Sequence, residues 1–222
     1  YASNYIYYKP GKTHVALNIP TGYINYPKAY YESGAMPVWT GATVMHRVVF
    51  EEMGGFPLGV KLGEDFLLWA KTAMHYPVVF LDEPLAWYNN DVPVTMRATR
   101  NLHAPEHHML FRLELAFGNI RRWGDGAIRS SEVDWQRLID KLRINGLLEY
   151  WLSVVYHDQA AEELKKVDWS KQSNSTKRMY KTPIWILKVK RQVMRVGSVM
   201  KQALVKHWQN QSNTRMSSLN RN

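Results

Sequence analysis

The first hundred residues alternate between short apolar runs and turns rich in glycine and proline, a pattern typical of a domain that mixes strands and helices. The β-branched run over 38–45 predicts a strand, and further strands are predicted over 78–81 and 85–88. Helices are predicted over 47–53, where the glycine pair at 54–55 would end the helix, and over 64–74. The opening stretch, 1–31, predicts short strands and loops, so the expected fold class is α/β.

Beyond residue 100 the apolar positions recur three and four residues apart, which predicts helices. One helical region is marked by Met109, Leu113, Phe117 and Ile120. A second, with Gly146 as a break within it, is marked by Trp135, Leu138, Leu142, Trp151 and Val155. Residues 170–176 are polar and predict a linker. The predicted organisation is a first domain over 1–100, a helical extension over 101–168, and the linker with a basic tail over 169–222.

Composition narrows the classes of protein to consider. With 222 residues, 45% of them hydrophobic and 22% charged, the chain has the profile of a globular protein with a substantial core. It contains no cysteine, which excludes a disulfide scaffold, a thiolate metal site and cysteine nucleophile chemistry. No apolar run is long enough to span a bilayer. Because the first residue is Tyr and not Met, we expect the chain to be part of a longer gene product.

The net charge of +10 is confined to the tail. Asp168 is the last acidic residue, and the segment 169–222 carries twelve Lys or Arg, whereas 1–168 carries 17 basic and 19 acidic residues. Over 185–204 the apolar residues share one helix face and the basic residues the other, which predicts an amphipathic helix that binds an anionic membrane surface through residues 181–208. The alternative is a helix that packs on the body with its charges solvated. Nucleic acid is not a predicted partner, because the basic face lacks interleaved aromatic residues.

An acid pair, Glu64-Asp65, opens the helix predicted over 64–74. Taken alone, this pair is explained by helix capping and by the favourable interaction of carboxylates with the helix dipole. The sequence before the pair suggests a second interpretation. The pair is preceded, in this order, by Trp39-Thr40-Gly41-Ala42, a predicted helix, and Gly54-Gly55-Phe56-Pro57. This ordered series, together with the strand over 84–88, resembles the acceptor-side half of the GT-A glycosyltransferases of family 2. The resemblance covers roughly residues 1–100.

The resemblance implies a partial GT-A (Rossmann-like) mixed sheet with helices, followed here by the helical extension and the tail. It implies inverting transfer of a sugar from a nucleotide-sugar donor to a saccharide or lipid-linked acceptor, as in bacterial polysaccharide biosynthesis. Asp65 would be the general base and Glu64 would support it. The substrate-binding candidates are Trp39, Thr40, Gly41, Gly55, Phe56, Trp69 and Arg97. Phe56 and Trp69 could equally be core residues, and Arg97 a solvated loop charge.

The chain departs from the family in its metal and donor motifs. These enzymes bind a divalent metal, Mn²⁺ or Mg²⁺, and the nucleotide through an upstream Asp-x-Asp motif, which is absent from this sequence. We therefore expect the donor-binding half to be missing and assign no metal ligand in this chain. His103, His107 and His108 resemble a metal cluster, but without partnering carboxylates surface positions are favoured. The expected location is the cytoplasm, peripheral on the inner face of the membrane. The alternative function is a non-catalytic module that associates with a membrane surface through the basic tail.

Overall fold

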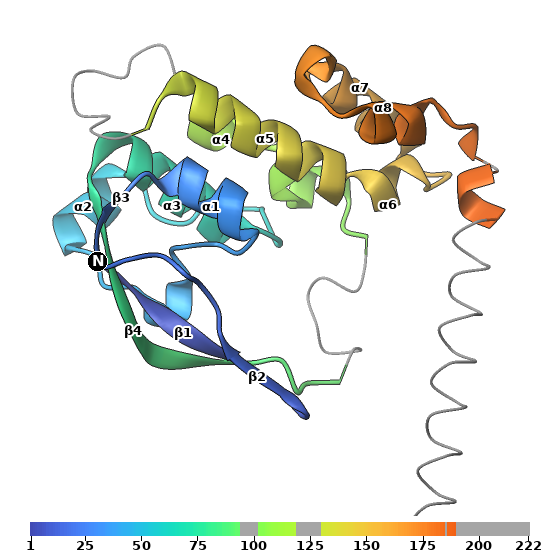
Figure 1. Ribbon diagram of the computed structural model, residues 1–222. Helices are drawn as coiled ribbons and strands as arrows, with labels where there is room; N and C mark the ends of the chain where they lie inside the picture. The colour runs from blue at the N-terminus through green and yellow to red at the C-terminus, as the bar shows by residue number, and fades with distance from the viewer. Residues whose placement is uncertain (94–101, 119–129, 185, 190–222) are drawn as a thin grey trace, which may run out of the picture. The chain divides into compact units, whose positions relative to one another are not determined.

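The computed structural model describes residues 1–93, 102–118, 130–184 and 186–189, and it is a mixed α/β structure (Figure 1). The α/β class is therefore confirmed. The chain divides into two compact units, Tyr1–Val167 and Asp168–Asn222. Among the described residues, no helix is both long enough and apolar enough to cross a membrane.

The sheet of the first unit has four strands in the order β2-β1-β4-β3. The strands are β1 (Ala2–Lys9), β2 (Lys12–Val15), β3 (Gly22–Ile24) and β4 (Val78–Asn89). β1 and β4 are parallel, with Tyr5 opposite Ala86 and Tyr7 opposite Tyr88, whereas β2 and β3 pair antiparallel with their neighbours. The sheet is therefore mixed and small, with β1 and β4 at its centre.

Helices and short turns of 3₁₀ helix make up the rest of the first unit. In chain order they are α1 (Tyr26–Ser33), η1 (Thr40–Ala42), α2 (Arg47–Glu52), α3 (Glu64–His75), η4 (Pro105–His107), η5 (Met109–Phe111), α4 (Glu114–Phe117), α5 (Glu132–Gly146), α6 (Leu148–Trp151) and α7 (His157–Lys165). The second unit contains η7 (Trp169–Lys171) and α8 (Asn174–Lys181).

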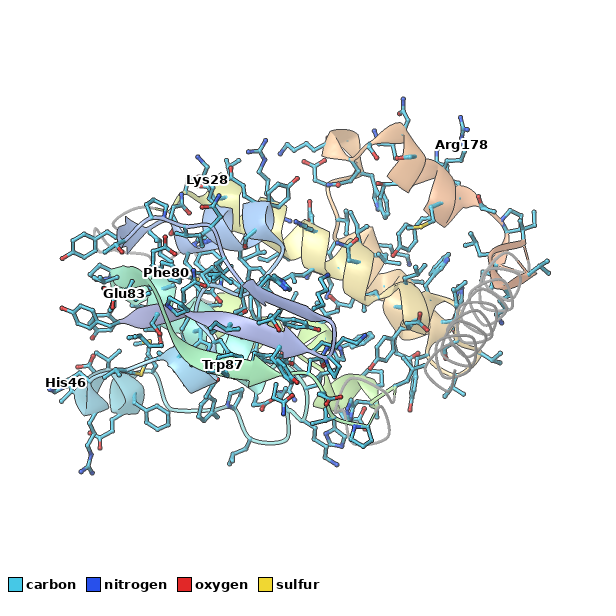
Figure 2. All side chains as sticks on the ribbon, turned by 60° about the horizontal axis from the view of Figure 1, so that its bottom comes forward. Lys28, His46, Phe80, Glu83, Trp87 and Arg178 are labelled. Atoms are coloured by element: carbon cyan, nitrogen blue, oxygen red, sulfur yellow. The ribbon has the colours of Figure 1, made fainter. Side chains whose placement is uncertain are left out.

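The core lies where α1, α3 and α5 gather on one side of the sheet (Figure 1). α3 supplies a continuous buried run from Phe66 to Ala70, and Phe80 of β4 is fully buried against it. Trp135 of α5 is also fully buried and stacks on Tyr26 of α1, with ring centroids 5.7 Å apart. Figure 2 shows the change in environment along β4, from the buried Phe80 to Trp87, which is exposed. The buried part of α3 therefore fixes the position of its N-terminal acid pair.

Two predicted helices are confirmed, and the strand predicted over 38–45 is wrong. α2 and α3 occupy the predicted positions. The run 38–45 instead contains η1, closed by hydrogen bonds that the Ala42 N–H (2.8 Å) and the Thr43 hydroxyl (2.7 Å) donate to the Trp39 carbonyl oxygen. The Trp39 indole folds back over Gly41, where a Cβ atom would lie within 2.8 Å of its ring carbons. Side-chain packing thus overrides the β-propensity of this run.

Three further boundaries differ from the predictions. The strands predicted over 78–81 and 85–88 form one strand, β4, whose register against β1 shifts around Asn4, opposite Pro84. The linker predicted over 170–176 instead contains η7 and the start of α8, which Ser173 caps. The helical region predicted after residue 105 forms three short elements, η4, η5 and α4. Of the predicted tail helix, residues 185 and 190–222 lie outside the described residues.

Candidate functional site

The predicted acid pair lies in the first turn of α3. The glycine just before it allows the side chain of Met109 to pack closely against the backbone. Gly63 precedes the pair with φ of 81°, a left-handed conformation that strains any residue with a side chain. A Cβ atom at this position would also collide with the side chain of Met109. Glu64 and Asp65 are both half-buried. The two carboxylates therefore lie at the positive end of the helix dipole. The backbone just before them is constrained by the positive φ of Gly63 and by the side chain of Met109.

Hydrogen bonds connect Asp65 to the turn at residue 40. The Thr40 hydroxyl donates to Oδ2 of Asp65 at 3.2 Å, and the backbone N–H of Phe66 donates to Oδ1 at 2.8 Å. The indole N–H of Trp69 donates to the Thr40 hydroxyl oxygen at 3.3 Å. Because Thr40 accepts from the indole, its single hydroxyl proton is directed at the carboxylate. The structure thus brings together three predicted site residues, Thr40, Asp65 and Trp69.

The other predicted residues of the first motif stand beside this group. Trp39 is half-buried, and its ring packs against Tyr5 of β1 and Tyr88 of β4, with centroids 5.1 and 5.2 Å away. Gly41 lies beneath the Trp39 indole and permits this packing because it has no Cβ atom. Trp39 therefore connects the Thr40 turn to the two central strands.

The turn after α2 contributes Gly55 and Phe56. Gly55 has φ of 67° and lies against the ring of Phe50. Phe56 is 40% exposed and meets the rings of Phe50 and Trp69 edge-on, at centroid distances of 5.7 and 6.2 Å. Trp69 itself is only 6% exposed, so it belongs to the core and acts on the site through its N–H. Of these aromatic candidates, Phe56 has the most accessible ring.

Two tyrosines of α1 that the sequence did not single out share the electrostatic environment of Asp65. Burial, and then the negative charge of Asp65, raise the pKa of Tyr30 to about 12. Burial raises the pKa of Tyr26 as well, and its hydroxyl has no hydrogen-bond partner among the described residues. Both phenols are therefore neutral at physiological pH beside the carboxylate. No sequence signal places these residues near Asp65, because the contact depends on how α1 packs on α3.

The remaining candidates are Arg97 and the histidines at 103, 107 and 108. Arg97 lies outside the described residues. His108 is buried, so the surface position favoured for it is wrong; it packs edge-on against the rings of Phe111 and Tyr150, at 6.2 and 5.3 Å. Over the described part of the chain, no group of three or more His, Asp or Glu side chains could hold a metal ion. The described residues therefore offer no set of ligands for Mn²⁺ or Mg²⁺, and we assign no reaction step to a metal.

A groove and a cleft lie at different places on the first unit. A groove of about 890 Å³ lies between the loop 15–21, α1 and β4, and its walls include none of the predicted site residues. A cleft of about 270 Å³ lies between α2, α3 and β4, and Trp69 is part of its wall. The cleft therefore adjoins the hydrogen-bonded group at Asp65, although the groove is larger.

Comparison with protein-family models, with curated proteins and with solved structures finds no match to this chain. The function is therefore inferred from the ordered motifs and from the geometry that they adopt. That geometry is a carboxylate at a helix N-terminus, oriented by the Thr40 hydroxyl, which in turn accepts from Trp69; the partly exposed ring of Phe56 packs against Trp69.

Proposed function

We propose that the chain is the acceptor-side part of an inverting, family 2-type glycosyltransferase with Asp65 as its general base. The observation that supports this proposal best is the hydrogen bond between Thr40 and Asp65, which joins two motifs 25 residues apart. The third motif meets the same group through the contact of Phe56 with Trp69. Motifs that merely end helices and turns would not need to meet in one group of contacting side chains.

The reaction assigned to this site is a single displacement at the anomeric carbon of the donor sugar. An acceptor hydroxyl oxygen forms the new bond to this carbon, while the bond from the carbon to the donor phosphate breaks. The nucleoside diphosphate leaves with the bonding electron pair, and the hydroxyl proton passes to Asp65. Because attack occurs on the face opposite the leaving group, the configuration at the carbon inverts.

The contacts of Asp65 suit this role. Each carboxylate oxygen accepts one hydrogen bond, from Thr40 or from the Phe66 N–H, and so keeps a lone pair free for the acceptor hydroxyl. The helix dipole favours the ionised carboxylate, which is the form that accepts a proton. Glu64, the neighbouring residue, would hold a second acceptor hydroxyl. The flat ring of Phe56 offers a surface to the C–H face of a sugar.

The test is the substitution Asp65→Asn in the intact enzyme that contains this chain. Asn preserves the shape and can still accept from Thr40, but it cannot take a proton. We expect sugar transfer to fall by about a hundredfold or more, the usual contribution of a general base, while donor binding is unchanged. Glu83→Gln, which removes an exposed carboxylate of β4, is the matched control and should retain full transfer. Full activity of Asp65→Asn would refute the proposal.

A second candidate function, association with an anionic membrane surface, is favoured by α8. This helix begins with polar residues and carries Lys177, Arg178 and Lys181, and no acidic residue follows Asp168 in the sequence. Cationic side chains near an anionic bilayer each contribute about 1 kcal/mol of binding free energy. The two functions are compatible, because the tail would locate the enzyme and Asp65 would perform the transfer.

A further inference from the structure

A row of aromatic rings leads from the candidate site across the sheet. Trp39, next to Thr40, contacts Tyr88 of β4 at a centroid distance of 5.2 Å. Tyr88 stacks on Tyr7 of β1 at 5.6 Å, with the two ring planes 10° apart, and Tyr7 contacts the His14 ring of β2 at 5.1 Å. These contacts follow the order of the strands, so the rings share one face of the sheet. This aromatic strip therefore begins beside Thr40 and ends on the edge strand β2 (Figure 1).

Two lysines extend the aromatic strip on the same face. Side chains two residues apart along a strand lie on the same side, so Lys9 shares the face of Tyr7. Lys12 is opposite Lys9 in the pairing of β1 with β2, and His14 is opposite Tyr7. Both lysines are exposed, and β1 and β2 contain no Asp or Glu. Neither lysine forms an ion pair with a described residue, including Asp91, which follows β4. The outer end of the strip is therefore positively charged and accessible to an anion.

The packing of the rings favours a carbohydrate over a nucleic acid. A nucleic-acid base stacks on the free face of an aromatic ring. Tyr7 has a ring on each side, because β1 lies between β4 and β2. The strip offers instead the phenol hydroxyls and the imidazole nitrogens as hydrogen-bonding groups. The Tyr7 hydroxyl accepts from the Asn90 side-chain amide, and its own proton can still be donated. Such groups, followed by two ammonium groups, suit the hydroxyls and anionic groups of a sugar chain.

The length of the strip indicates a chain of several sugars. Tyr5 of β1 contacts Trp39 at a centroid distance of 5.1 Å, and Lys9 lies four residues farther along the same strand. At about 3.3 Å per residue, these four residues cover roughly 13 Å. A single sugar ring does not reach across this distance. The anionic group that the lysines meet therefore belongs to a sugar remote from the one that reacts.

We infer that the aromatic strip, with Lys9 and Lys12, binds an acidic polysaccharide, a sugar polymer that carries anionic groups along its length. The inference rests on the proposed function in one respect, because it takes this polymer as the acceptor whose end reaches Asp65. It adds the charge of the acceptor, on which the motif series has no bearing. Lysines on an edge strand also discourage unwanted strand pairing, but that role does not require them to share a face with the rings.

The test measures binding to the full chain at the strip itself. Hexagalacturonate, neutral maltohexaose and an oligothymidylate of the same length are titrated in about 0.15 M salt, and the ring resonances of Tyr7 and His14 are followed by NMR. These resonances report on the strip and not on the basic tail. We expect hexagalacturonate to bind about threefold to twentyfold more tightly than maltohexaose, because an exposed ion pair contributes up to about fivefold and two lysines act here. Equal affinities for the two saccharides, or tighter binding of the oligothymidylate, would overturn the inference.

Paired lysine substitutions test the role of charge. Lys9→Gln combined with Lys12→Gln should reduce the preference for the acidic hexamer to less than about twofold, whereas Lys9→Arg with Lys12→Arg should preserve it. The matched control is Lys177→Gln with Lys181→Gln, which removes the same charge from α8 and should leave binding at the strip unchanged. A full preference in the Lys9→Gln, Lys12→Gln variant would refute the role of these lysines.

A second pair of variants tests the face of the sheet. His14→Ala should weaken hexagalacturonate binding, measured at Tyr7, by about threefold to tenfold. Thr13→Ala changes the adjacent exposed residue of β2, on the opposite face, and should bind as the wild type. Equal effects of the two substitutions would refute binding on this face.

The inference and the proposed function can fail separately. If hexagalacturonate prefers the strip but Asp65→Asn retains full transfer, the proposed base is wrong and the binding site is confirmed. If Asp65→Asn abolishes transfer but the strip shows no preference for the acidic hexamer, the base is supported and the acidic acceptor is refuted.

Discussion

The buried His108 makes the segment beside the candidate base sensitive to acid. This segment is tied to the residues just before α3: the Lys61 N–H donates to the His107 carbonyl oxygen at 2.8 Å, and the Met109 N–H donates to the Leu62 carbonyl oxygen at 3.0 Å. The ring nitrogen Nδ1 of His108 accepts from the Leu110 N–H at 3.1 Å. A proton on that nitrogen would break this bond and place a charge in the core.

Burial, and to a lesser degree His103, lower the pKa of His108 from 6.5 to about 4. Between these two values the unfolded chain binds a proton that the folded chain does not, so stability increases with pH in this window. The contribution is complete above pH 6.5 and is lost as the pH falls toward 4. A pKa difference of this size corresponds to about 3 kcal/mol of unfolding free energy.

The measurement is urea unfolding at pH 7 and at pH 4.5, followed by circular dichroism, for the wild type and for His108→Asn. Asn preserves an acceptor for the Leu110 N–H but does not titrate. We expect the variant to be less stable at pH 7 and to lose about 2 kcal/mol less than the wild type on acidification. His75→Asn, at an exposed position, is the matched control and should behave as the wild type. Equal losses in His108→Asn and wild type would refute this role of His108.

Three further predictions concern the site and the tail. Trp69→Phe keeps an aromatic side chain but removes the indole N–H that donates to Thr40, so transfer by the intact enzyme should fall by about threefold to tenfold; an unchanged rate would show that the indole has only a packing role. Gly41→Ala forces the Trp39 ring to move and should lower the unfolding free energy by about 1–3 kcal/mol in urea titrations, an expectation that wild-type stability would contradict. Deleting residues 181–222 should abolish any preference for sedimenting with anionic over neutral vesicles, and the deletion fails to support the tail's role if the preference persists.

The parts of the fold that local signals encode could be predicted from the sequence. α2 and α3 are framed by glycines with positive φ: Gly54 and Gly55 follow the end of α2, and Gly63 precedes α3. The acid pair in the first turn of α3 follows from the same local rule. Where the backbone itself requires a residue type, a single sequence is sufficient to place the element.

The parts that depend on long-range packing could not be predicted. The run 38–45 has the composition of a strand, but the Trp39 ring needs the space above Gly41 and the sheet already has its four strands among the described residues. The hydrogen bond from Thr40 to Asp65 and the nearness of Tyr30 depend on how α3 packs against η1 and α1. The sequence could therefore nominate the site residues, but it could not state which of them touch.

Trp69 connects the candidate base to the core of the domain. Its ring is only 6% exposed, so it cannot serve as a sugar platform, but its N–H donates to the Thr40 hydroxyl oxygen, and the Thr40 hydroxyl donates to Asp65. A change in the packing around the Trp69 ring would therefore move the hydroxyl that orients the carboxylate. If Asp65 is the base, its reactivity then depends on core packing as well as on the groups that touch it.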